Sequence, residues 1–184
     1  MKKTILSIVC LLLILTACSS KSGVPSEPSG QKYVSTDGHF SIGLAGEPTL
    51  TQLPAIEGQT SAGRLFSWKI DGGMYTVGYT DWVIEPMDEA EILRISSQNV
   101  IAGATSKGGV LVFSEAIKVN GCSGIESRLL ISNNIFLYRH IAKGNRLFLS
   151  SARWPESENG ERQKAVLDSF EINSPLYAKT IGFF

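Results

Sequence analysis

Apolar and polar residues alternate along several stretches of the chain, which is the pattern of strands that bury one side. The clearest stretch is residues 74–82, where Tyr75 and Tyr79 share one side and small or polar residues occupy the other. Residues 63–70 alternate in the same way, and the Asp-Gly-Gly sequence at 71–73 favours a tight turn between the two stretches. The pattern therefore predicts a β-hairpin in this part of the chain.

Further strands are predicted on both sides of this hairpin, at residues 39–44, 110–119, 124–132, 135–143 and 146–154. Short turn sequences separate the last four strands, at 121–124, 133–134 and 144–145. Residues 43–54 are predicted to be irregular, because Gly46, Pro48 and Pro54 interrupt them.

The spacing of apolar residues changes twice to that of an amphipathic helix. Residues 86–106 begin with a proline and an acidic turn and end just before the two glycines at 108 and 109. Residues 161–169 predict a second helix, which residues 170–172 extend briefly. The order of strands, helix, strands and helix predicts an α+β fold, in which an antiparallel sheet of six to seven strands packs against helices.

One more apolar run, at residues 5–15, follows two lysines and precedes the sequence Leu-Thr-Ala-Cys. It is shorter than the roughly 20 residues of a membrane span and fits the core of a signal peptide. The Leu-Thr-Ala-Cys sequence is typical of the cleavage and lipidation site of bacterial lipoproteins. We therefore predict a signal peptide at 1–17 and a lipidated Cys18. Its acyl chains would anchor the protein in a lipid bilayer on the extracytoplasmic side, facing the periplasm or the cell surface.

The remaining chain divides into a tether and one domain. Nine of the fourteen residues at 19–32 are Ser, Gly or Pro, so 18–32 is predicted to be a flexible tether. Residues 33–184 contain all sixteen aromatic residues and are long enough for one domain with its own core. The apolar C-terminal tail, with Ile181, Phe183 and Phe184, is expected to dock on that domain.

Charge and cysteine content narrow the classes of function. Loss of residues 1–17 leaves 15 basic and 17 acidic residues, so this near-neutral domain has no electrostatic basis for binding nucleic acid. Beside the lipidated Cys18, only Cys122 remains, and we interpret it as a small buried or half-buried filler rather than a reactive thiol. The sequence has no spacing typical of metal ligands, so we expect no metal site and no cofactor.

Catalytic arrangements have little support in the sequence. The two histidines, His39 and His140, lie at the start of a predicted strand and inside another, and no Gly-x-Ser-x-Gly elbow supplies a nucleophile. The acidic residues between 81 and 91 suit the start of a helix better than a paired-carboxylate site. We therefore expect a protein that is not an enzyme.

Four motifs, taken in order, resemble the bacterial PsbP-like domains over about residues 34–172. They are DGHFSIGLAGEP at 37–48, MYTVGYTDW at 74–82, GCSGIE at 121–126, and GNRLFLSSARWP followed by AVLDSFEI within 144–172. The resemblance implies the α/β/α sandwich of the photosystem subunit PsbP and of the Ran-binding nuclear import factor. It also implies a non-enzymatic binding or assembly factor, and it brings over no catalytic residue.

Aromatic and arginine side chains supply the candidate binding residues, because arginine beside aromatic residues is typical of the centres of protein interfaces. The candidates are Tyr79, Asp81, Trp82, Arg128, Arg139 and Arg153. The alternative is that the aromatic residues build the core while the arginines occupy the opposite face of the sheet.

These observations together favour a membrane-anchored envelope protein that binds another, unidentified envelope protein and supports the assembly or stability of a complex. The alternative function is a small-ligand or lipid-binding module with a pocket between sheet and helix.

Overall fold

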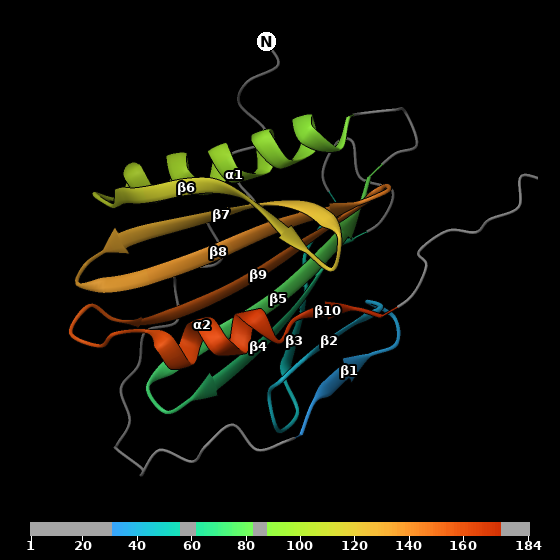
Figure 1. The fold of residues 1–184 in the computed structure, drawn as a ribbon, viewed down its shortest axis with the longest axis horizontal. Helices are drawn as coiled ribbons and strands as arrows, with labels where there is room; N and C mark the ends of the chain where they lie inside the picture. Colours follow the sequence, from blue (N-terminus) through green and yellow to red (C-terminus); the bar gives the residue numbers. More distant parts are fainter. Residues whose placement is uncertain (1–30, 56–61, 83–87, 174–184) are drawn as a thin grey trace, which may run out of the picture.

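The computed structural model describes residues 31–55, 62–82 and 88–173 (Figure 1). The predicted signal peptide, Cys18, the tether through Gly30 and the C-terminal tail from Ser174 lie outside these residues. No helix in the described part of the chain is both long enough and apolar enough to cross a lipid bilayer.

Seven of the described strands form one antiparallel sheet, in the spatial order β3-β4-β5-β9-β8-β7-β6 (Figure 1). Their bounds are β3 (Thr49–Gln52), β4 (Arg64–Ile70), β5 (Gly73–Asp81), β6 (Val110–Val119), β7 (Cys122–Ile131), β8 (Asn134–Lys143) and β9 (Arg146–Pro155). The predicted α+β class and the expected number of strands in the main sheet are confirmed.

A second, three-stranded sheet is an addition to the single sheet that the sequence predicts. It consists of β1 (Tyr33–Ser35), β2 (Phe40–Ile42) and β10 (Glu171–Ile172), with β2 in the centre and antiparallel to both neighbours. An ion pair of 2.5 Å between Lys32 Nζ and Glu171 Oε2 adds to this contact. The two ends of the described chain therefore meet on β2.

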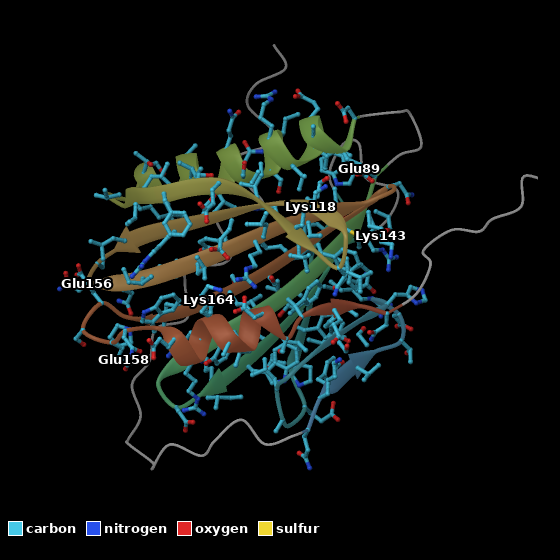
Figure 2. The ribbon with its side chains drawn as sticks, viewed as in Figure 1. Glu89, Lys118, Lys143, Glu156, Glu158 and Lys164 are labelled. Atoms are coloured by element: carbon cyan, nitrogen blue, oxygen red, sulfur yellow. The ribbon has the colours of Figure 1, made fainter. Side chains whose placement is uncertain are left out.

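The two helices lie on opposite faces of the seven-stranded sheet. Helix α1 (Glu89–Thr105) begins where the Asp88 side chain accepts a hydrogen bond from the backbone N–H of Ala90, and it packs against β6, β7 and β8. Helix α2 (Glu161–Asp168) packs against β9 on the other face. Glu89 also accepts a hydrogen bond from the backbone N–H of Gly144 at 2.9 Å, at the end of the sheet where Lys143 lies (Figure 2).

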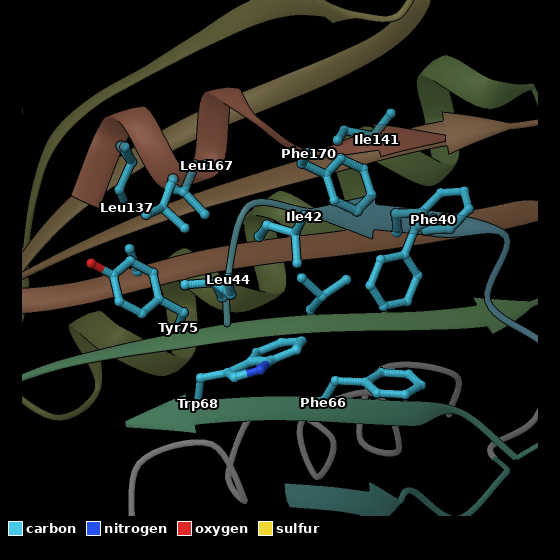
Figure 3. Close-up of a cluster of buried hydrophobic side chains, with 14 of the residues drawn as sticks. Phe40, Ile42, Leu44, Phe66, Trp68, Tyr75, Leu137, Ile141, Leu167 and Phe170 are labelled. Carbon is cyan, nitrogen blue, oxygen red and sulfur yellow. The ribbon is translucent and has the colours of Figure 1, made fainter. Parts of the chain in front are cut away.

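The largest hydrophobic core lies between the seven-stranded sheet and the layer that contains α2 and the small sheet (Figure 3). Phe40 and Ile42 of β2 are fully buried there, with Leu167 and Phe170 from the C-terminal end of the chain. The rings of Phe40 and Phe66 meet edge to face, with centroids 5.2 Å apart. On the other face, Ile92, Leu93 and Ala104 of α1 pack on apolar residues of β7, β8 and β9.

Two local predictions are wrong. Residues 43–54 are not irregular throughout, because Thr49–Gln52 form β3, which pairs with the start of β4. The turn after β6 is formed by Asn120 and Gly121, with φ of 49° and 80°. Residues 122 and 123, predicted to belong to that turn, already pair within β7.

Candidate functional site

The six candidate binding residues are divided between the two faces of the seven-stranded sheet. Residues directly opposite each other in neighbouring strands share a face. Arg128 lies opposite Leu137, on the face that carries α2, whereas Arg153 lies opposite Phe136, on the face that carries α1. The structure therefore does not bring the three arginines together into one surface.

Arg139 lies at the centre of an ion-pair network on the α2 face. Its Nε donates to Glu126 Oε2 at 2.5 Å and its Nη2 donates to Asp168 Oδ1 at 2.7 Å, while Lys164 also pairs with Asp168. Burial acts to raise the pKa of Asp168, but hydrogen bonds from Lys164 and Arg139 outweigh it, so the pKa is lowered. Both charges of the Glu126–Arg139 pair are buried. Because Arg139 also bonds to Asp168, the network joins β7 and β8 to the end of α2.

Asp81 and Tyr79 are held by a residue that the sequence does not single out, Arg146. The Arg146 guanidinium donates two hydrogen bonds to the Asp81 carboxylate, at 2.6 and 2.8 Å, and lies 4.5 Å from the centre of the Tyr79 ring. It also donates to the backbone carbonyls of Asp37 and Gly38. This cluster fastens the turn before β2 to the main sheet, and burial raises the pKa of the Tyr79 phenol above its ordinary value.

Trp82 and Arg128 are also engaged in packing. Trp82 is half-buried against the cluster that contains Ile92 and Leu93 of α1. The Arg128 guanidinium lies 5.9 Å from the centre of the Trp154 ring, within cation–π distance. Phe136 and Tyr138 on the α1 face are also buried in packing: their rings stack with centroids 6.1 Å apart, in the cluster that contains Ala104 of α1.

His140 is sealed inside the protein. Only 1% of its surface is exposed, and neither ring nitrogen has a hydrogen-bond partner in the described part of the chain. It lies opposite Ile125 and Leu149 on the α1 face, and burial lowers its pKa to about 4. The imidazole is therefore neutral at pH 7 and is buried among apolar residues of the sheet.

Cys122 is half-buried and packs against the largest core, in agreement with its interpretation as a filler. Among the residues that the structure describes, no group of three or more His, Cys, Asp or Glu side chains could hold a metal ion.

Of the five large apolar residues that are exposed in the described chain, three lie together at the start of β6. Val110, Leu111 and Val112 are 59%, 41% and 53% exposed, and the strand register shifts between Leu111 and Phe113. Within the described chain, β6 is an edge of the seven-stranded sheet and pairs with β7 alone. We call these three residues the β6 apolar edge; the sequence predicts the strand but not its edge position.

A hollow of about 600 Å³ lies at the opposite end of the sheet. Its walls come from β3, β4 and β5 and the chain on both sides of β3; lining residues include Glu47, Thr51, Leu65, Lys69, Met74 and Thr76. Leu65, Lys69, Met74 and Thr76 share the α1 face, but α1 packs on β6, β7 and β8. This hollow therefore lies beside α1, on the part of that face which the helix does not cover.

Neither a protein-family model nor a curated protein sequence matches the chain. Among solved structures, it is similar to cyanobacterial PsbP from Synechocystis, with 16% identity and a TM-score of 0.52, over 86% of this chain and 98% of that one. This likeness confirms the PsbP-like fold that the four motifs predict.

Two further solved structures are more distant. LpqN of Mycobacterium tuberculosis, described as involved in cell envelope biogenesis, is 13% identical with a TM-score of 0.48, over 78% of this chain and 91% of that one. A protein from Bacteroides thetaiotaomicron is 13% identical with a TM-score of 0.45, over 79% of this chain. The match spans 49%, about half, of the Bacteroides protein.

Proposed function

We propose that this PsbP-like chain is an envelope lipoprotein, anchored through Cys18, whose domain is not an enzyme but binds a protein partner. The β6 apolar edge carries the proposal. An edge strand presents unpaired backbone N–H and C=O groups, to which an extended segment of another protein can add as a further strand. The exposed side chains of Val110, Leu111 and Val112 would then be covered by that segment.

The arrangement of charged residues supports a binding role over a catalytic one. The Glu126–Arg139 and Asp81–Arg146 pairs join structural elements, and His140 lies in a closed apolar environment. A lipid anchor would add to the contact, because confinement at a membrane raises the effective concentration of the protein near a membrane-bound partner. A weak edge contact would then be sufficient in the cell.

The test is photo-crosslinking in intact cells from position 112, with a photoreactive amino acid in place of Val112. Leu50 provides a matched control, because it is 55% exposed and lies in β3, the strand at the opposite edge of the sheet. We expect one extracytoplasmic protein to crosslink from position 112 but not from position 50. Equal crosslinking from both positions, or none from position 112 in the anchored protein, would contradict the proposal.

A further inference from the structure

We propose that the hollow beside β3, β4 and β5 binds an anionic amphiphile. Its carboxylate or phosphate head would lie between Lys69 and Arg153, and its apolar chain would lie over Leu65 and Met74. This site is separate from the β6 apolar edge, at the other end of the sheet, and does not depend on the proposed partner.

The register of the sheet places the two cations on one face. Lys69 of β4 lies opposite Met74 of β5, and Met74 lies opposite Arg153 of β9. The three residues thus form one row across three strands. Neighbouring strands are about 4.8 Å apart, so the Cα atoms of Lys69 and Arg153 lie on the order of 10 Å from each other. An oxyanion held over Met74 is within reach of both side chains.

Neither cation has an ion-pair partner among the described residues. Arg153 is half-buried, and its Nε is buried without a hydrogen-bond acceptor. An unsatisfied buried donor of a charged group is costly, and an anionic ligand would supply the acceptor. Lys69 and Glu47 line the hollow, and Arg153 lies beside it on β9, opposite Met74. Glu47 forms no ion pair with Lys69 among the described residues, so the three groups together leave one positive charge.

The lining of the hollow is suited to an apolar chain. Leu65 and Thr76 are 9% and 2% exposed and close the sheet side, and Leu53, Pro54 and Met74 add apolar surface, while Ser67 and Thr76 contribute hydroxyl groups between Leu65 and Met74. The volume of about 600 Å³ is within the range of about 300–1,000 Å³ that is typical of small-ligand sites. A partly apolar floor beside two cations is complementary to a molecule with a charged head and a hydrocarbon chain.

The test measures binding of laurate and dodecyl phosphate to the purified chain carrying Cys18→Ser, so that attached acyl chains cannot compete. Acetate and inorganic phosphate lack the chain, dodecanol lacks the charge, and dodecyltrimethylammonium reverses it. We expect laurate or dodecyl phosphate to bind, and the short anions and the cationic amphiphile not to bind. Affinity should rise by up to about fourfold per added CH₂ in a series from octanoate to laurate. The tighter of the two heads identifies a carboxylate or a phosphate as the natural group.

Substitution of both cations, Lys69→Met with Arg153→Met, is expected to weaken laurate binding at least tenfold and to leave the weaker binding of dodecanol unchanged. Lys107→Met is the matched control, because Lys107 is an exposed lysine just after α1.

Absence of laurate and dodecyl phosphate binding would overturn the proposal. Equal affinity of the double variant for laurate, at an unchanged unfolding temperature, would overturn it as well.

Discussion

Two pairs of buried or half-buried charged residues in the described structure face each other across neighbouring strands. Glu126 of β7 is directly opposite Arg139 of β8, and Asp81 of β5 is directly opposite Arg146 of β9. Since burial removes water from both charges, each partner depends on the other for compensation. These residues therefore contribute to the choice of strand register as well as to stability.

Removal of one partner of the Glu126–Arg139 pair should be much more damaging than removal of both. We expect Arg139→Met to lower the free energy of unfolding by about 3–5 kcal/mol, because Glu126 then remains buried without its cation. The double variant Glu126→Leu, Arg139→Met should recover most of this loss. Urea unfolding of the single and double variants measures the coupling, and additive effects would contradict a tightly coupled pair.

Burial of His140 makes stability depend on pH. Its pKa is about 4 in the folded protein and about 6.5 when unfolded, so the unfolded chain binds more protons between these values. The contribution of neutral His140 to the free energy of unfolding is therefore fully present above about pH 6.5. It is lost as the pH decreases toward 4, and the loss is about 2 kcal/mol at pH 5.

Denaturant unfolding at pH 7.5 and pH 5 tests this dependence. His140→Leu should abolish most of the difference between the two pH values. His39→Asn should keep the difference, because this variant retains His140, and asparagine tolerates the φ of 54° at position 39. A difference that persists in His140→Leu would show that other groups cause it.

The face of a strand on which a residue lies could be predicted from the sequence better than the residue with which it pairs. The alternation of side chains along a strand puts Phe136, Tyr138 and His140 of β8 on one face. The pairing of Asp81 with Arg146 could not be predicted, because it depends on β5 and β9 being neighbours and on their register. That Arg153 lies on the opposite face from Arg128 and Arg139 also depends on strand register.

At the scale of the elements, the start of α2 requires a glycine at position 160. Gly160 lies at the start of α2 with φ of 73°, and a Cβ added there would lie 2.4 Å from the Trp154 ring. Gly72 has a similar φ of 78°, but a Cβ there would have nothing within 4 Å. The two positions therefore separate the cost of backbone strain from the cost of a steric clash.

We expect Gly72→Ala to lower the free energy of unfolding by about 1–2 kcal/mol, from the left-handed backbone alone. Gly160→Ala should lower it by about 1–3 kcal/mol more, because Trp154 must move within the core. Thermal and urea unfolding measure both variants side by side. Equal losses would mean that the core accommodates the added methyl group without strain.

Strongly patterned elements were predictable and short exposed ones were not. The bounds of β4, β5, β8, β9 and α2 agree with the apolar periodicity within about two residues. By contrast, all four residues of β3 are exposed, so no alternation marks them. That strand exists because its backbone pairs with β4, which is a tertiary interaction.

The layers of the whole molecule follow from the order of its elements, whereas the small sheet depends on contacts between distant segments. Strands of two and three residues carry too little pattern to predict that β1 and β10 would share β2. The hollow could not be foreseen either, because it depends on where α1 stops along the sheet.

The lipid anchor is a prediction about the whole molecule that cell fractionation tests. The protein should be found with the membranes, and Cys18→Ala should release it, because no lipid can then be attached. Cys122→Ala is the matched control and should leave the protein with the membranes, since Cys122 packs against the domain core. Equal membrane association of the Cys18→Ala form would contradict anchoring through this residue.

The central position of β2 has a mechanical consequence. β1 is the first described strand after residue 31, and it is held by three antiparallel residue pairs with β2. Tension applied through the preceding chain would peel β1 from β2 one pair at a time, starting at Tyr33 and Ile42. The Tyr33 ring would leave Phe66 and Trp68 of β4 as this hairpin opens, since the ring centroids lie 5.9 and 5.2 Å apart. The small sheet would thus act as a weak link that yields under force while the main core stays folded.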